Sequence, residues 1–238
     1  MTEQSTIKVP QQITTALLSP RRPEEDRERD AVRHLGELLT FYGVRPGLHV
    51  ADLMASSGYL TGALAEMVGD AGLVYAQNSP QLLARFKGES PIRKRIADCG
   101  LTNVRDVVCE LEDLQLPEGG LDIIFSFMFY HDTVWVGTDR AAMNAAIFRS
   151  LKPGGILAVV DHHAPAGAGT TVAKDHHRVE RASVVQEVTA AGFVLGDESS
   201  LLENPADPLN VLVFDKTVRH RTHRFTLKFR RPGEAPGQ

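Results

Sequence analysis

Short apolar segments alternate with helix-like segments along most of this 238-residue chain, and this alternation constrains the fold more than any other feature. Each apolar segment has the length of one strand. Segment 121–129 (LDIIFSFMF) is apolar almost throughout, as expected for a parallel strand covered on both faces. Strands are expected at 48–53, 73–77, 104–109, 121–129, 156–161, 193–201 and 223–230. Strands that alternate with helices indicate a three-layer α/β sandwich with a mostly parallel sheet.

The intervening segments have the spacing of helices. We expect helices at 23–42, 59–68, 139–151 and 175–191, and a broken one at 80–97. No helix separates the last two strands, which indicates a closing antiparallel hairpin with residues 202–222 as its long connection. Residues 1–30 are expected to form an N-terminal arm with a short helical turn at 13–18, and residues 31–238 a single domain.

Composition excludes several classes of protein. Apolar residues make up 42% and charged residues 24% of the chain, which is ordinary for a globular domain. A net charge of −4 disfavours a generic nucleic-acid binder. No apolar run is long enough to span a membrane, and no secretion signal is visible, so we expect a cytoplasmic protein. The two cysteines support neither a disulfide framework nor a zinc-thiolate site.

The first strand–helix junction, residues 50–61 (VADLMASSGYLT), is the first candidate binding site. Ligands of open α/β sheets bind at the carboxyl ends of the strands, and a loop of small residues lets the backbone approach them closely. The junction is not the G-x-G-x-x-G dinucleotide fingerprint, because Gly58 is the only glycine in the turn. Taken alone, the loop could equally be a tight turn without a ligand.

The junction resembles motif I of class I S-adenosylmethionine-dependent methyltransferases, usually D-x-G-x-G-x-G. Asp52, Ala55 and Gly58 match the motif, whereas Met54 and Ser56 stand where the family has glycines. Further segments resemble family motifs in family order. They are 73–78 (LVYAQN), 107–117 (VVCELEDLQLP), 121–127 (LDIIFSF) and 151–162 (LKPGGILAVVDH). The resemblance covers about residues 30–195.

The details are most similar to a little-characterised bacterial group of methyltransferases. The shared features are VYAQN at 74–78, YHD at 130–132, VDH at 160–162 and an R-F-x-L-K-F-R-R-P ending at 224–232. The resemblance implies a Rossmann-like, seven-stranded fold and S-adenosyl-L-methionine as the cofactor. It assigns cofactor binding to Asp52, Met54, Ala55, Ser57, Gly58, Tyr59, Gln77, Asn78, Glu110, Leu111 and Phe127.

Two of these assignments leave an alternative open. Gln77 stands where most family members have an acid for the ribose hydroxyls; an amide can accept and donate there, or it can be only a polar residue at a strand end. Glu110 takes the place of the acid that contacts the adenine amino group, but it also lies in a segment that could be a solvated loop.

Catalytic residues are expected where the fourth and fifth strands end. Methyl transfer to a protonated acceptor needs a base, and His131 is our candidate, with Tyr130, Asp132 and His162 beside it. In the alternative, Asp132 caps a helix and His131 is buried and satisfied. A divalent ion on Asp132, Asp161 and His162 is a second alternative, although no spacing supports a zinc site and none is predicted. A His176–His177 pair lies on the segment that would cover this face.

The expected partner is a small-molecule substrate, acted on by an S-adenosylmethionine-dependent methyltransferase. Residues 216–231 contain seven Lys or Arg and no acid, which keeps an acidic substrate or RNA as an alternative, although binding to a nucleic acid or a membrane is not expected. Within 223–230, Phe225, Leu227 and Phe229 are expected on one strand face and Arg224, Lys228 and Arg230 on the other. A non-methylating activity on the same fold, such as a cyclisation, and a homodimer also stay open.

Overall fold

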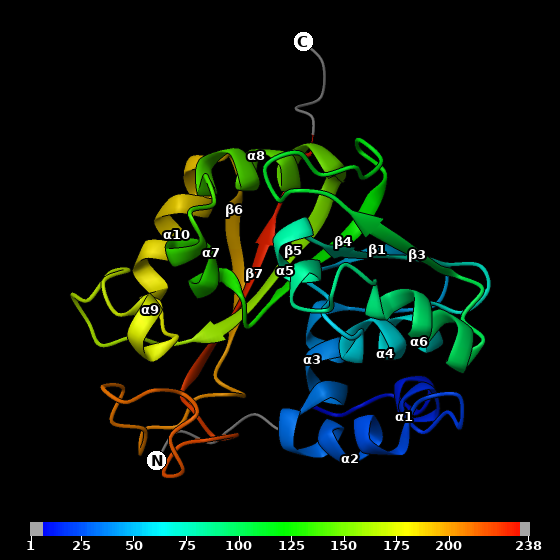
Figure 1. Ribbon diagram of the computed structural model, residues 1–238, viewed down its shortest axis with the longest axis horizontal. Helices are drawn as coiled ribbons and strands as arrows, with labels where there is room; N and C mark the ends of the chain where they lie inside the picture. Colours follow the sequence, from blue (N-terminus) through cyan, green and yellow to red (C-terminus); the bar gives the residue numbers. More distant parts are fainter. Residues whose placement is uncertain (1–6, 234–238) are drawn as a thin grey trace.

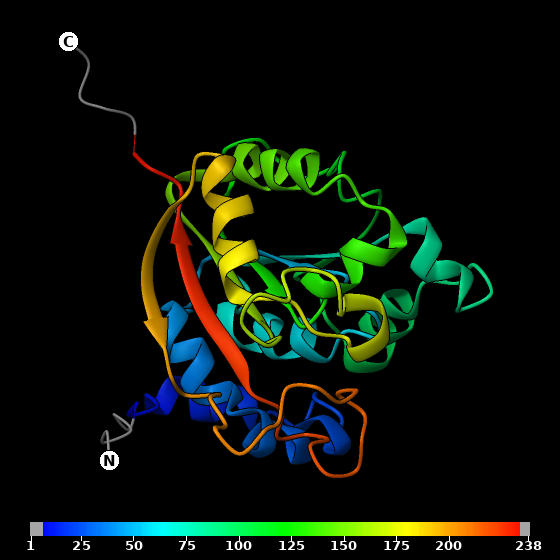
Figure 2. The same ribbon diagram turned by 90° about the vertical axis from the view of Figure 1, so that its left-hand side faces the viewer.

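A computed structural model describes residues 7–233 and shows a seven-stranded sheet between two layers of helices (Figure 1). The strand order is β3-β2-β1-β4-β5-β7-β6, with only β7 antiparallel to its neighbours. The strands are β1 His49–Leu53, β2 Leu73–Asn78, β3 Val104–Val108, β4 Leu121–Phe127, β5 Leu151–His162, β6 Val194–Ser199 and β7 Arg224–Arg230. The predicted Rossmann-like architecture, with its closing β6–β7 hairpin, is therefore confirmed (Figure 2).

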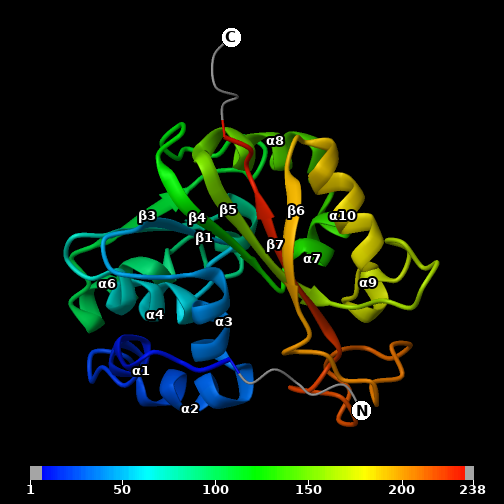
Figure 3. The same cartoon turned by 180° about the vertical axis from the view of Figure 1, so that it is seen from behind.

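Ten helices are formed by the described residues. They are α1 Gln11–Leu17, α2 Glu24–Arg33, α3 Leu35–Tyr42, α4 Tyr59–Val68, α5 Pro80–Ala84, α6 Pro91–Cys99, α7 Tyr130–Val136, α8 Arg140–Ser150, α9 Ala173–His176 and α10 Arg181–Ala190. Helices α3 and α4 cover one sheet face, whereas α8 and α10 cover the other (Figure 3). Alternate residues of each central strand enter the two cores, as Val50 and Ala51 do in β1. No helix within residues 7–233 has the length and apolar character needed to cross a bilayer.

Two helices that the spacing predicts as continuous are broken, and both predictions were wrong in this respect. Segment 23–42 divides into α2 and α3 at His34, and segment 175–191 divides into α9 and α10 at His177. Both histidines have a left-handed backbone, with φ of 52° and 53°. In the second case tertiary contacts oppose the helix, because Arg178 is buried on Asp207 and Val179 forms a β-bridge with His163. The break turns His177 toward the carboxyl end of the sheet.

The basic face of β7 is largely buried, which the amphipathic pattern of the strand does not indicate. Phe225, Leu227 and Phe229 enter the core as expected, but Arg224 and Lys228 are only 7% and 8% exposed. Lys228 lies 4.3 Å from the centre of the Phe41 ring of α3 and pairs with Asp197. The N-terminal helices thus cover a face that the alternation alone assigns to water.

Ion pairs and hydrogen bonds attach α2 to the body of the sheet. Asp26 pairs with Arg95 of α6 at 2.6 Å, and Tyr59 at the start of α4 donates to Asp30 at 2.8 Å. Residue 30, the predicted boundary between the arm and the domain, lies within helix α2. The boundary itself stays a prediction. These contacts place the cationic face of α2 beside the carboxyl ends of the strands.

Candidate functional site

A cavity of about 590 Å³ opens at the carboxyl ends of β1, β4 and β5. This is where the strand order reverses between β1 and β4, the usual ligand site of an open α/β sheet. Nine of the predicted site residues line it: Asp52, Met54, Ala55, Ser57, Tyr59, Phe127, His131, Asp132 and His162. The volume is in the range of small-molecule and cofactor sites.

The loop after β1 keeps a glycine-type backbone without the family's glycines. Met54 and Ser56 have φ of 50° and 53°, in the left-handed region that disfavours side chains. Three amides of this loop are held by β2: Met54 N–H donates to Oε1 of Gln77, Ala55 N–H to the Gln77 carbonyl, and Ser56 N–H to Oδ1 of Asn78. The strained loop is therefore stabilised by the end of the neighbouring strand.

Gln77 and Asn78 are fully buried and line neither the large cavity nor the small one beside it. Gln77 also donates to the Cys109 carbonyl at 2.7 Å, so its oxygen and its NH₂ group both have protein partners. In this conformation the two amides hold the loop, and their side chains do not face the space where a ribose would lie.

Gly58 does not line the cavities but is required by the backbone around it. Its φ is +81°, and an added Cβ would lie 2.7 Å from Cδ of Arg95 and 2.9 Å from Cδ1 of Ile92. It begins α4, whose first residue, Tyr59, does reach the cavity.

Glu110 and Leu111 line a separate small cavity of about 70 Å³. Met54, Leu82, Arg85, Phe129 and Asp132 border both this cavity and the large one. The residues that the resemblance assigns to the adenine end thus line a different cavity from most of the others.

Asp52 is a buried carboxyl at the cavity floor. Burial raises its pKa to about 7, against smaller opposing effects of hydrogen bonds from Thr61, whose hydroxyl donates to Oδ2 at 2.7 Å. An ammonium group that entered the cavity would favour the ionised form and would gain a charge-assisted hydrogen bond.

The raised pKa of Asp52 predicts a stability that falls as pH rises. The protonated form is favoured in the folded chain, so its contribution is complete below the unfolded pKa of 3.8 and is lost as pH rises through about 7. We expect the free energy of unfolding of Asp52→Asn to rise relative to wild type between pH 5 and pH 8, by at most about 4 kcal/mol at the upper end. Thermal unfolding at both pH values measures this difference, and a constant difference would contradict it.

His131, in the first turn of α7, is held by a buried carboxylate of β5. Its Nδ1 lies 2.6 Å from Oδ1 of Asp161, and its backbone N–H donates to Oδ2 of Asp161 at 2.9 Å. Desolvation of the buried ring lowers the pKa of His131, but Asp161 and Asp132 outweigh it and raise the pKa to about 10. Its second ring nitrogen, Nε2, is the one left to act in the cavity.

Three side chains meet at that second nitrogen. Nε2 of His131 lies 3.2 Å from Oδ1 of Asp132 and 3.2 Å from Nδ1 of His177, and the same Nδ1 lies 3.2 Å from the same Oδ1. His177 was not among the predicted site residues. Its only sequence signal was its place in a histidine pair on the covering segment.

The other two predicted catalytic residues lie in different surroundings. Tyr130 points away from the cavity, into the helical layer, where its hydroxyl donates to Glu187 and accepts from Asn144. His162 lines the cavity, with its ring centre 5.7 Å from that of His131. Burial lowers the pKa of His162 well below its usual value, so this ring is neutral. The structure therefore brings together His131, Asp132 and His162 but not Tyr130.

Arginines make up the part of the cavity that sequence reasoning missed. Arg29, Arg33, Arg85 and Arg224 all line it. Among the described residues Arg224 forms no ion pair, and its Nε is buried without a hydrogen-bond partner. Burial lowers the pKa of Arg224 to about 10, which still leaves it cationic at neutral pH. Strand β7 thus offers the cavity a cation without an acidic partner.

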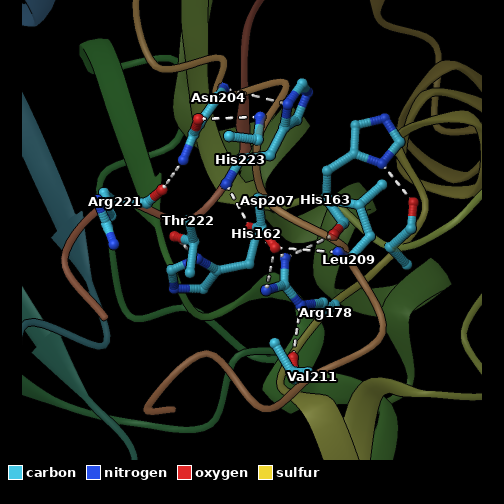
Figure 4. A network of polar contacts seen from close by, with 12 residues as sticks. His162, His163, Arg178, Asn204, Asp207, Leu209, Val211, Arg221, Thr222 and His223 are labelled. Atoms are coloured by element: carbon cyan, nitrogen blue, oxygen red, sulfur yellow. Dashed lines mark hydrogen bonds and ion pairs between the residues drawn. The ribbon is translucent and has the colours of Figure 1, made fainter. Parts of the chain in front are cut away.

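Residues of the long connection between β6 and β7 also line this cavity, and a polar network around Arg178 holds the connection in place (Figure 4). Arg178 is fully buried, donates twice to Asp207 at 3.0 Å, and donates to the carbonyls of Val211 and His163. Thr222 lies 2.8 Å from Nδ1 of His162, and Phe214 of the same connection lines the cavity. His163 lies outside, with its ring against His223. One buried ion pair therefore anchors the segment that covers the site.

The residues present fit S-adenosylmethionine at its methionine end. The buried Asp52 lines the cavity, the loop after β1 has the backbone of a glycine loop, and Arg33 and Arg224 offer cations for a carboxylate. The ribose end departs from the family, since Gln77 takes the place of the acid and is already engaged.

Comparison with known proteins agrees with this fit. Residues 50–155 match the family model described as "Methyltransferase domain". The ubiquinone/menaquinone biosynthesis C-methyltransferases UbiE of Shewanella halifaxensis and Shewanella woodyi are each 33% identical over 124 residues, which are 52% of this chain and 46% of those proteins. The match thus spans about half the length of these curated relatives.

Solved structures share the fold across more of the chain. A SAM-dependent methyltransferase from Aquifex aeolicus superposes with a TM-score of 0.62 at 18% identity, covering 88% of this chain and 98% of that one. The [4+2]-cyclase SpnF also has a TM-score of 0.62, at 16% identity and 93% coverage of each chain. At such identities the likeness shows the fold alone. Residues 50–155 thus match a methyltransferase domain, and the fold of the chain agrees with that match.

Proposed function

We propose that the protein transfers a methyl group from S-adenosylmethionine to a small-molecule acceptor in the cavity at the carboxyl ends of β1, β4 and β5. One observation carries this proposal: the cavity has the loop after β1 on one side and the polar cluster of His131, Asp132, His162 and His177 on another. A cofactor held by the loop and an acceptor held at the cluster would share one enclosed space.

S-adenosylmethionine supplies a methyl group already activated on a sulfonium, so the protein has mainly to hold and align the acceptor. We infer that Asp52 receives the cofactor's ammonium group and that Phe127 and the loop after β1 form the wall beside it. Gln77 and Asn78 support the loop from behind. Glu110 and Leu111 would come into contact with the adenine only if the small cavity and the large one joined.

Nε2 of His131 is the atom through which the polar cluster would act on the acceptor. Nδ1 is already engaged with Asp161, which fixes the orientation of the ring. In a metal-free enzyme Nε2 would have to lose its own proton before it could accept one from the acceptor, because the two carboxylates raise the pKa of His131 to about 10. The base assigned from sequence is thus well placed but is held mainly in its protonated form.

The arginines of the cavity favour an acceptor that carries negative charge. Arg224 is buried without an acidic partner, and Arg33 lies beside it on the same cavity. A buried cation without a partner is costly in the free protein, and a bound carboxylate or similar anion would offset that cost. The acceptor, or the cofactor's own carboxylate, is the group expected there.

Replacing Arg224 should separate stability from anion binding. Arg224→Met removes a buried unpaired cation, so we expect a melting temperature equal to or above that of wild type. Stabilisation by sulfate, used as an anion probe at constant ionic strength, should fall by more than half. Arg230→Met is the matched control, because Arg230 lies on the same strand but is half exposed and should behave as wild type. A large loss of stability in Arg224→Met would show that the cation is structural.

The proposed cofactor is tested by calorimetric titration with S-adenosylhomocysteine. We expect saturable 1:1 binding that weakens at least about tenfold in Asp52→Ala, as for loss of a charge-assisted hydrogen bond. No heat of binding at millimolar ligand would refute the proposal.

The reaction is tested with methyl-labelled S-adenosylmethionine and small-molecule extracts fractionated by charge. Label should pass to a low-mass product of the acidic fraction, with one S-adenosylhomocysteine released per product. Consumption of a substrate without release of S-adenosylhomocysteine would instead support a non-methylating activity on this fold.

A further inference from the structure

The three atoms that meet beside the cavity form an equilateral triangle. Nε2 of His131, Oδ1 of Asp132 and Nδ1 of His177 are each 3.2 Å from the other two. All three can carry a lone pair directed to a common point, and among the described residues they form the one group of histidine, cysteine or acidic side chains with the arrangement of a metal site.

Hydrogen bonds account poorly for this triangle. Each ring nitrogen can contribute at most one proton, and that proton can point along only one edge. If both nitrogens are protonated and donate to Asp132, the contact between the two rings becomes a repulsive one between donors. Charge-assisted hydrogen bonds are also shorter, at about 2.7–2.9 Å. Three equal edges of 3.2 Å therefore do not correspond to one network of protons.

A metal ion accounts for all three edges at once. Donors ~2.1 Å from a tetrahedral ion lie ~3.4 Å apart, and donors on one face of an octahedral ion lie ~3.0 Å apart. The observed edges fall between these two values. Two imidazole nitrogens and one carboxylate oxygen are donors that suit zinc, cobalt and ferrous iron better than magnesium or calcium.

The surroundings of the triangle match the second shell of a metal site. A ligating histidine usually donates its other ring N–H to a carboxylate, and Nδ1 of His131 lies 2.6 Å from Asp161, which is fully buried. The Trp135 indole N–H donates at 3.1 Å to Oδ1 of Asp132, the same oxygen that belongs to the triangle, and orients that carboxylate. His177 is held in place by its left-handed backbone at the end of α9.

The triangle also has an open side. All three residues line the large cavity, so a metal ion on them would keep at least one coordination position directed toward it. This is the arrangement of catalytic sites, which retain an open position, and not of closed structural ones.

We propose that His131, Asp132 and His177 bind one divalent transition-metal ion, of the zinc, cobalt or ferrous class, with its open side toward the cavity. The set differs from Asp132, Asp161 and His162, which the sequence offered, since Asp161 supports His131 from behind and His162 contacts Thr222. If the proposed methyl transfer holds, an oxygen or sulfur of the acceptor would occupy the open position. The ion would then lower that group's pKa, as it does for bound water.

The test uses the untagged full-length chain, stripped with a chelator and titrated with Co²⁺ alone. We expect one Co²⁺ per chain by elemental analysis, and visible absorption bands whose intensity distinguishes tetrahedral from octahedral geometry. Zn²⁺ and Fe²⁺ should compete for the same site. His177→Ala should weaken binding at least ~100-fold, and Asp132→Asn, which keeps the shape of the side chain, at least ~10-fold.

His49→Ala is the control, because His49 is an exposed histidine at the opposite end of β1 and its loss should leave Co²⁺ binding unchanged. Absence of Co²⁺ binding at micromolar metal would overturn the proposal, as would binding that His177→Ala leaves intact. S-adenosylhomocysteine titration of the stripped protein separates this result from the proposed function. If S-adenosylhomocysteine binds while Co²⁺ does not, only the metal proposal fails.

Discussion

His131→Ala is expected to lower methyl-transfer turnover by roughly 10²–10⁴-fold while leaving affinity for S-adenosylhomocysteine unchanged. The ring lies at the acceptor end of the cavity, fixed by Asp161 on one nitrogen and presented to Asp132 and His177 by the other. Asp52 and the loop after β1, which we assign to the cofactor, do not contact it. Release of S-adenosylhomocysteine, measured with methyl-labelled S-adenosylmethionine and the acidic extract fraction, gives the turnover, and calorimetry gives the affinity.

His163→Ala is the matched control for this variant. His163 follows directly after the last residue of β5, but its ring packs on His223 and Phe225 outside the cavity. The turnover of this variant should therefore stay within a few-fold of wild type. Equal turnover in His131→Ala and wild type would exclude both roles that we assign to Nε2. A loss of cofactor affinity that parallels the loss of turnover would place His131 at the cofactor.

Asp207→Ala is expected to destabilise the protein by about 3–5 kcal/mol, as for removal of one partner of a buried ion pair. Both side chains of the Arg178–Asp207 pair are fully buried, and Asp207 also accepts from the backbone N–H groups of Leu209 and His223. Without the carboxylate, the Arg178 guanidinium stays in the interior with only carbonyl partners. Chemical denaturation measures the loss, and limited proteolysis within residues 202–222 should accelerate with it.

A double variant shows whether the buried charge or the backbone hydrogen bonds of Asp207 cause the loss of stability. In Arg178→Met with Asp207→Leu neither charge remains buried, so we expect most of the lost stability to return. If the double variant is as unstable as Asp207→Ala, the backbone hydrogen bonds of Asp207 carry the stabilisation, and not its charge. A change below 1 kcal/mol in Asp207→Ala would contradict the role of this pair as the anchor of the covering segment.

The sheet could be predicted from the sequence because each strand carries its own signal. The apolar run of β4 and the alternation in β7 depend on local pattern, and so does the break between α5 and α6 near Gly88 and Pro91. The break at His177 has no such signal. It results from the pairing of Arg178 with Asp207, which lies 29 residues away, and from the bridge between His163 and Val179.

The candidate site also has features that the sequence predicts and features that it does not. Its place at the ends of β1, β4 and β5 follows from the topology, and His131, Asp132 and His162 were predicted on that basis. The inward direction of Arg224 could not be predicted, because strand alternation shows which residues share a face but not that the N-terminal helices cover it. The sequence showed that Gln77 is an amide at the end of a strand. Its hydrogen bonds to the loop and to Cys109 could not be predicted, because they depend on the folded chain.

The central claim is that one cavity holds S-adenosylmethionine with its reactive sulfur toward the polar cluster. A crystal structure with S-adenosylhomocysteine bound tests it most directly. We predict density along the loop after β1, with the ammonium group at Asp52 and the sulfur directed at His131, Asp132 and His177. Density in another part of the molecule, or a sulfur turned away from these three side chains, would contradict the account.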